Sequence, residues 1–391
     1  MASPVEPGPT HEEQFLTLCL RGVLDPSHLE EAAALAGRQP LDWDRVSQAA
    51  RQNSLQALLY YKLRGKHILP QGVEESWSQA YYQTAAYNSL LLRELDSILR
   101  AFAAEGVPVL LLKGAAFVDA LYQNPGVRPM VDLDLLVPRD QVERAERALQ
   151  DVGFGMSTSD PWPGFSWRYR NSAAYGRPIA PEPSFYVGLH IRPYDIGYYE
   201  RTPVADWFDR AVPVLRDGFA ARMPAPEDHL VYLCGHQALH HLYGSSLLRL
   251  LDMALLIQGA AGGLDWDAVV RRTAAWRLVL PVRRTLAEIA SIWPGLVPEA
   301  ATAAVSQLTP TPGERRVQEW VLRHRTPTAD TLLALATMPG LGRRARFLLE
   351  AAFPSPEYMR RRYCPGRPGL WPLAYLQRAG LALRGLAQRL R

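Results

Sequence analysis

Two acidic residues, Asp132 and Asp134, stand two positions apart in an apolar run that extends from Val131 to Val137. Alternate residues of a β-strand point to the same face, so both carboxylates are expected on one side of a strand. Carboxylates in an apolar strand are costly to bury unless they are paired or bind a metal. We therefore expect the two acids to hold a divalent metal ion. The alternative is a strand end with solvated acids, or ion pairs to Arg128 and Arg139.

A second feature that could take part in chemistry is the pair Lys113-Gly114, which follows the apolar run Leu110–Leu112. Gly114 has no Cβ, so it allows the backbone to turn sharply and to approach a phosphate closely. The N–H groups of a short helix after it would face that phosphate. Lysine is rare in this chain, at positions 62, 66 and 113 only, which makes Lys113 conspicuous. The alternative interpretation is an ordinary exposed turn.

Composition limits the class of protein. A chain of 391 residues can form two domains, or one domain with a large helical appendage. The net charge of +4 is too small to be a nucleic-acid signal. The three cysteines are far apart and form neither a disulfide framework nor a metal motif. With no signal peptide and no run of about 18 apolar residues for a membrane span, we expect a cytoplasmic protein.

Hydrophobic periodicity predicts how the elements follow one another. A helix is expected over 74–104, with strands over 107–112, 131–137 and 185–191 and helices over 115–122 and 141–151 between them. Residues 155–183 show no sustained period, which favours a long loop or an irregular hairpin. The predicted organisation is a disordered tail over 1–14, an N-terminal helical cap over 15–89, an α/β core over 90–215 and a C-terminal helical domain over 216–391.

The turn followed by an Asp-x-Asp strand resembles the nucleotidyltransferase superfamily of the DNA polymerase β type. The wider pattern resembles an uncharacterised bacterial branch of that superfamily. The resemblance implies an α+β fold with a polymerase β-like core, in which a small mixed sheet is flanked by N-terminal helices and a C-terminal helical domain. The residues that carry it are Lys113-Gly114, Tyr122, Pro125, Arg128, Asp132 to Val137, Leu189-His190, His236, His240 or His241, Leu250 to Ala254, and Phe353-Pro354 to Tyr363.

The resemblance also implies a reaction. An acceptor oxygen of a small molecule or peptide would attack the α-phosphate of a nucleoside triphosphate, and pyrophosphate would leave. Mg²⁺, or Mn²⁺, would neutralise the developing charge. The implied catalytic residues are Asp132 and Asp134, which would also be the metal ligands, and His190. The implied nucleotide-binding residues are Lys113, Gly114, Arg128 and Arg192, and the residues of a possible acceptor cleft are His236, His240, His241 and Asp252.

One departure from the family pattern concerns Gly188. Members with the full motif have an acid at this position, two residues before His190, where it completes the metal triad and serves as base. Three explanations stay open. Glu182 or Asp195 could supply the acid from a neighbouring segment, or two acids could suffice for slower chemistry. In the third, transfer activity is lost and the protein is a nucleotide-binding or regulatory protein.

Three histidines, His236, His240 and His241, have the helical spacing of zinc ligands. A metal-dependent hydrolase is therefore a further hypothesis, although Gln237 stands where a His-Glu-x-x-His motif has its glutamate. The alternatives are packing, with hydrogen bonds to Asp252 or Arg249, and a place in the acceptor cleft.

Overall fold

The computed structural model describes residues 9–157, 160–177, 185–195, 197–199, 202–216, 219–241, 246–324, 327–364, 369, 371–378 and 380. Residues 1–8 of the predicted tail, and Glu182, lie outside these ranges. His11 to Gln14 do not belong to a disordered tail, because helix α1 begins at His11. A capping box starts this helix: Thr10 Oγ1 accepts the Glu13 N–H, and the Glu13 carboxylate accepts the Thr10 N–H.

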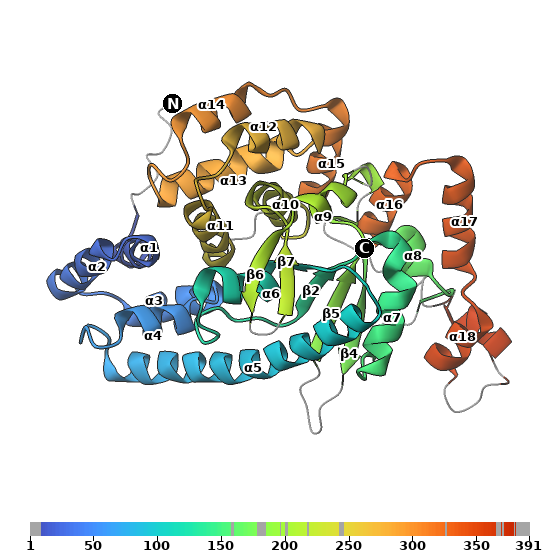
Figure 1. Cartoon of the computed structure of the whole chain (residues 1–391), viewed down its shortest axis with the longest axis horizontal. Coiled ribbons are helices and arrows are strands. Elements are labelled where there is room, and N and C mark those ends of the chain that lie inside the picture. Colours follow the sequence, from blue (N-terminus) through green and yellow to red (C-terminus); the bar gives the residue numbers. More distant parts are fainter. Residues whose placement is uncertain are drawn as a thin grey trace.

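The N-terminal part consists of helices only. They are α1 (His11–Leu24), α2 (Ser27–Arg38), α3 (Trp43–Gln52), α4 (Gln56–Leu63) and α5 (Gln71–Ala104). The first four lie together at one end of the molecule, while α5 runs along its lower edge in Figure 1.

Helix α5 has 34 residues and is therefore about 51 Å long. The residues that predicted this helix, Leu91, Leu95, Ile98 and Phe102, are all buried, and Gly106, with φ of +63°, follows its end. The helix continues without a break through residues 89 and 90, so the predicted boundary between cap and core falls inside one rigid element.

A five-stranded sheet lies at the centre of the molecule, in the order β1-β2-β5-β4-β3. Strands β2 and β5 are parallel neighbours, and the other pairs are antiparallel. Asp134 is opposite Gly188 in the β2–β5 register, and Leu136 is opposite His190. The strands are β1 (Leu110–Leu112), β2 (Leu133–Leu136), β3 (Gly155–Met156), β4 (Ser172–Arg177) and β5 (Phe185–His190).

The segment 155–183, predicted to be a long loop or an irregular hairpin, contains strands β3 and β4 with helix α8 (Phe165–Tyr169) between them. Because β3 and β4 pair antiparallel, the described part of this segment is an irregular hairpin. The other elements here are α6 (Lys113–Phe117), the π-helical turn η1 (Val118–Tyr122), the 3-10 turn η2 (Arg139–Gln141), α7 (Val142–Asp151), the 3-10 turn η3 (Gly197–Tyr199) and α9 (Ala205–Arg210).

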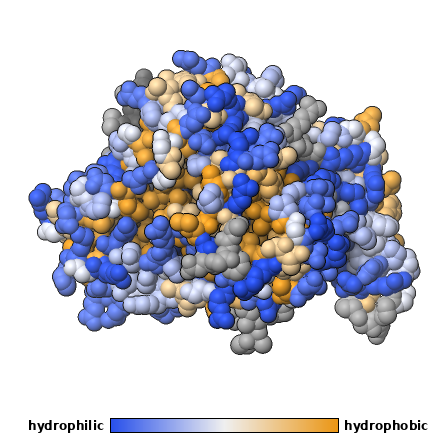
Figure 2. Space-filling view, viewed as in Figure 1, coloured by the Kyte–Doolittle hydropathy of each residue, from blue (hydrophilic) through white to orange (hydrophobic). Residues whose placement is uncertain are grey.

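A separate hairpin of β6 (Val212–Arg216) and β7 (Phe219–Met223) covers the β1 side of the core. The domain boundary predicted between residues 215 and 216 falls inside strand β6, where both residues are paired with β7. Figure 2 shows hydrophobic residues gathered across the middle of this face, between α5 and the upper helices. A cavity of about 200 Å³ lies there, lined by residues that include Phe102, Leu110 and Phe208.

After β7 the described chain is helical, as the sequence predicted for the C-terminal part. Helices α12 to α14 form the upper part of the molecule in Figure 1, and α16 to α18 lie along one side. These helices are α10 (Pro226–Leu239), α11 (Leu247–Gly259), α12 (Trp266–Ala275), α13 (Val279–Ile292), α14 (Glu299–Gln307), α15 (Pro312–Arg323), α16 (Pro327–Thr337), α17 (Leu341–Ala352) and α18 (Pro356–Tyr363). No helix of the described residues combines the length and the hydropathy that a membrane crossing requires.

Candidate functional site

Asp134 is the centre of the candidate site, because both of its carboxylate oxygens have a partner. Oδ2 lies 3.0 Å from the Lys113 ammonium, and Oδ1 lies 2.7 Å from Nε2 of His190. Burial alone would raise the pKa of Asp134, but the Lys113 charge and the His190 hydrogen bond outweigh it and hold the pKa well below its usual range. Three residues that the sequence predicted separately are thus in direct contact.

Asp132 lies directly before β2 and is less buried than Asp134. Its pKa is raised, first by burial and then by repulsion from the Asp134 carboxylate, while Lys113 and His190 oppose the shift. The two carboxylates are therefore close enough to repel each other. A bound cation would relieve this repulsion.

The turn after β1 differs in one detail from the prediction. Lys113, and not Gly114, has the left-handed backbone conformation, with φ of +49°, which non-glycine residues rarely adopt. The absence of a side chain at Gly114 serves a different purpose, since a Cβ there would lie 2.4 Å from Nη1 of Arg128 and 2.9 Å from Cγ of Met130. The glycine therefore provides room for Arg128, and the strained residue is the lysine that binds Asp134.

Helix α10 forms the wall opposite Lys113. The ring of His229 is buried, and Nε2 accepts the Lys113 backbone N–H at 3.3 Å. Burial and the Lys113 charge lower the pKa of His229 to about 3, so the ring is neutral. One turn later, burial raises the pKa of Tyr232 to about 12, although the Lys113 ammonium acts in the opposite direction. Helix α10 therefore places two neutral polar side chains, His229 and Tyr232, beside Lys113.

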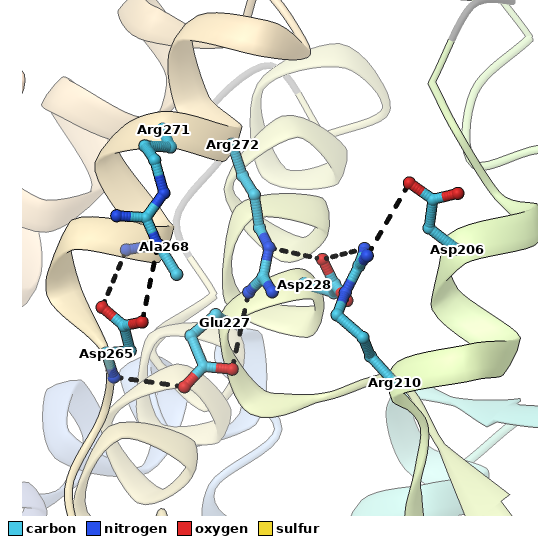
Figure 3. A network of polar contacts seen from close by, with 8 residues as sticks. All are labelled: Asp206, Arg210, Glu227, Asp228, Asp265, Ala268, Arg271 and Arg272. Atoms are coloured by element: carbon cyan, nitrogen blue, oxygen red, sulfur yellow. Dashed lines mark hydrogen bonds and ion pairs between the residues drawn. The ribbon is translucent and has the colours of Figure 1, made fainter.

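An ion-pair network holds the first turn of α10 in place (Figure 3). The fully buried Asp228 lies 2.9 Å from Nε of Arg210 in α9 and 2.9 Å from Nε of Arg272 in α12. Arg272 also contacts Glu227 at 3.5 Å. Because Asp228 directly precedes His229, this network fixes the helix that faces Lys113.

The three predicted acceptor-cleft histidines lie at the other end of α10. The ring of His236 stacks on that of His240, with centroids 4.6 Å apart, and meets the edge of His241 at 4.8 Å. Burial first and nearby cations second lower the pKa of His240 and of His241 to about 4. The same causes place the pKa of His236 well below its usual value. All three rings are therefore neutral at pH 7, and Lys113 contributes to each shift.

Arg128 and Asp252 form a buried ion pair that joins the core to α11. Nε and Nη2 of the guanidinium contact the two Asp252 oxygens at 3.0 and 2.7 Å, and the Tyr122 hydroxyl donates to Oδ1 at 2.8 Å. Asp252 therefore pairs with Arg128 rather than with the histidines. For Arg128 to bind phosphate as predicted, its guanidinium must share or leave this ion pair.

Gly188 occupies the position where family members with the full motif have a third acid. It lies directly beside the contact between Asp134 and His190. A Cβ at this residue would lie 3.0 Å from Nε2 of His190 and 3.1 Å from Oδ1 of Asp134. Asp195, one of the two predicted replacements, accepts the Asn171 N–H at 2.6 Å, and burial raises its pKa. The groups that act against this shift include Arg192 and His190, so Asp195 is a neighbour of the site. The other replacement, Glu182, lies outside the described residues.

Arg192, predicted to bind nucleotide, follows β5 by two residues and donates to the Arg170 carbonyl. The structure places it in a cavity together with four other arginines. Of these four, sequence analysis singled out only Arg139, as a possible ion-pair partner.

Two site residues, His229 and Tyr232, were missed by sequence analysis. They lie seven and four positions before His236, so a helical projection of residues 226–241 would have shown one polar stripe.

Asp132 and Asp134 fit a site for a magnesium–nucleotide complex better than a site in which protein side chains provide all the metal ligands. Within the described ranges, no three side chains of His, Cys, Asp and Glu come together as a metal-binding group. Mg²⁺ usually takes one or two carboxylates and obtains its other ligands from phosphates and water, which Asp132 and Asp134 can satisfy. A zinc hydrolase needs three protein ligands, and the described histidines do not provide such a group.

Comparison with known proteins gives the family. The family model described as uncharacterised nucleotidyltransferase matches residues 39–294, which is more than half of the chain, and the chain therefore belongs to this family. A solution structure of the antibiotic-resistance factor ANT(2'')-Ia is similar with a TM-score of 0.34 and 14% identity, over 51% of this chain and 96% of that chain. A search of curated proteins finds no match.

Proposed function

We propose that the protein transfers a nucleotidyl group from a nucleoside triphosphate to a small-molecule or peptide acceptor in a Mg²⁺-dependent reaction. The observation that carries the proposal is the cluster of Asp132, Asp134 and Lys113 beside the Gly114 turn. Asp132 and Asp134 would hold the metal, which supplies charge neutralisation at the phosphates. Membership in a nucleotidyltransferase family supports this reaction class.

The chain's own residues would orient the reactants. Lys113, whose pKa is raised because the Tyr232 and Asp134 contacts outweigh burial, stays charged and can pass from Asp134 to a phosphate oxygen. His190 holds Asp134 through one oxygen and leaves the other available when Lys113 moves. The neutral histidines of α10 can donate or accept a hydrogen bond from an acceptor without adding positive charge.

A second candidate function is a nucleotide-binding or regulatory protein with impaired transfer activity. Two observations favour it. Gly188 provides no third carboxylate, and both oxygens of Asp134 already have protein partners at 3.0 Å or less. A general base within hydrogen-bond reach contributes about 10²–10⁴-fold to a rate, so its absence alone can reduce turnover to a low level.

Replacing Asp132 with asparagine is expected to weaken Mg²⁺-dependent nucleotide binding at least about tenfold, because one of two metal carboxylates is removed. The melting temperature without ligand should stay unchanged or rise at pH 7. The pKa of Asp132 is raised in the fold, so its charged form destabilises the protein above that pKa, and asparagine removes this effect. At pH values where Asp132 is protonated, the variant should have no higher melting temperature than the wild type.

The measurement is calorimetric titration with a non-hydrolysable nucleoside triphosphate, with Mg²⁺ and with EDTA. Asp140→Asn provides a matched control, since Asp140 is an exposed acid of η2 outside the cluster. Unchanged Mg²⁺-dependent affinity in the Asp132 variant, or an equal loss in the control, would refute the metal assignment.

A further inference from the structure

A cavity of about 670 Å³ is lined by five arginines and by no acidic residue of the described chain. They come from four separate places: η2, α8, the end of β5 and the start of α17. The arginines are Arg139, Arg168, Arg192, Arg343 and Arg346. Like charges crowded into one cavity repel each other, so a compensating negative charge among them is stabilising.

Protein groups supply part of that compensation. The Glu350 carboxylate pairs with Arg168 at 2.9 Å and with Arg346 at 2.8 Å, and Arg343 donates to the Arg168 carbonyl at 2.6 Å.

The first turn of α17 adds backbone donors to the cavity wall. Gly342 and Arg343 line the cavity and belong to the first turn of α17, where the Arg344 N–H donates to the Gly340 carbonyl at 3.2 Å. Helices generally have acids in the first turn, but α17 has none there, and Arg343 and Arg344 stand in their place. Positive side chains together with the positive end of a helix favour an anion.

The residues that line the cavity do not include Asp132, Asp134 or Lys113. Arg139 follows the carboxyl end of β2, and Arg192 follows the carboxyl end of β5, the parallel neighbour of β2. Tyr169 lines this cavity and also a second one of about 710 Å³, whose wall includes Phe165, Phe347 and His240. The second cavity therefore gives room for the rest of a molecule whose anionic group binds the arginines. Its wall combines apolar side chains with polar ones such as Asp195 and Arg378.

We propose that the arginine cavity binds a phosphate group, either free or as part of a small molecule. The planar guanidinium makes two parallel hydrogen bonds to phosphate oxygens, which explains the use of arginine at all five positions. This binding site goes beyond the proposed transfer reaction and does not depend on a metal ion.

The test is calorimetric titration of the full chain with phenyl phosphate, inorganic phosphate and phenol, in EDTA and at low salt. Phenyl phosphate should bind, and Arg139→Gln and Arg346→Gln should each weaken its binding roughly tenfold or more, the value of one charge-assisted contact. Both arginines are exposed enough for replacement without loss of folding. Arg361→Gln, which removes an exposed arginine paired with Glu357 in α18, is the control and should bind as the wild type does.

The phosphate compounds distinguish the sources of the anion. Tighter binding of phenyl phosphate than of inorganic phosphate supports a phosphorylated small molecule, and equal binding supports free phosphate. Raised salt should weaken both, because the contacts are ionic. No binding of either phosphate at millimolar concentration, affinity unchanged in both arginine variants, or phenol binding as tightly as phenyl phosphate would overturn the proposal.

Discussion

Asp134→Asn is expected to destabilise the protein by about 3–5 kcal/mol at pH 7, because it breaks a buried ion pair and leaves one charge without its partner. The side chains of Asp134 and Lys113 are only 11% and 19% exposed, so water cannot replace the lost contact. His190 also loses its charged partner. The free energy of unfolding in urea measures the effect.

The pH dependence of this loss has a defined sign. The pKa of Asp134 is depressed in the fold, so the carboxylate contributes stability above its unfolded pKa of about 4, and this stability is lost as the pH falls. The difference between wild type and Asp134→Asn should therefore be largest near neutral pH and should shrink below about pH 4. Asp132→Asn, with its raised pKa, should show no such loss. Equal destabilisation by the two variants would contradict the charge arrangement described for the site.

Gly188→Asp is expected to raise the transfer rate by about 10²–10⁴-fold once an acceptor is supplied, the range for a positioned general base. The new side chain must displace His190 or Asp134 slightly, since its Cβ would lie 3.0–3.1 Å from both. A third carboxylate also adds repulsion without metal. We therefore expect lower stability in EDTA, stronger Mg²⁺ binding, and recovery of stability when the metal is bound.

Gly188→Ala separates the effect of space from that of charge, because it adds the Cβ without a carboxylate. It should share the packing cost and show no gain in metal affinity or rate. A wild-type protein that turns over at ordinary rates, with Gly188→Asp slower and with Glu182 or Asp195 indispensable, would show that another acid has replaced the missing one. The impaired-enzyme alternative would then be wrong.

Periodic segments of the chain were predictable, and irregular ones were not. The burial of Leu91, Leu95, Ile98 and Phe102 follows directly from their helical spacing, and the apolar runs before Lys113 and around Asp134 are strands as predicted. The bounds of strand β4 were not predicted within the expected loop or irregular hairpin, because the sequence Ser-Ala-Ala-Tyr-Gly-Arg has small residues and little alternation in hydropathy. Its place in the sheet depends on pairing with β5, which is a tertiary contact.

The candidate site was predictable in its residues but not in their partners. Residue types indicated Asp132, Asp134 and Lys113 because carboxylates and lysine are unusual in apolar runs. The sequence could not show that Arg128 pairs with Asp252, since 124 positions separate them. The arginine cavity was hidden for the same reason, because its members come from segments that meet only in the folded chain.

A crystal structure of the full chain with Mg²⁺ and a non-hydrolysable nucleoside triphosphate tests the central claim most directly. We expect a metal ion about 2.0–2.1 Å from oxygens of Asp132 and Asp134, a triphosphate beside Lys113 and Gly114, and the Lys113 ammonium moved from Asp134 to a phosphate. A nucleotide bound elsewhere, or a triphosphate at this turn with no metal on either aspartate and the Lys113–Asp134 ion pair intact, would contradict the account.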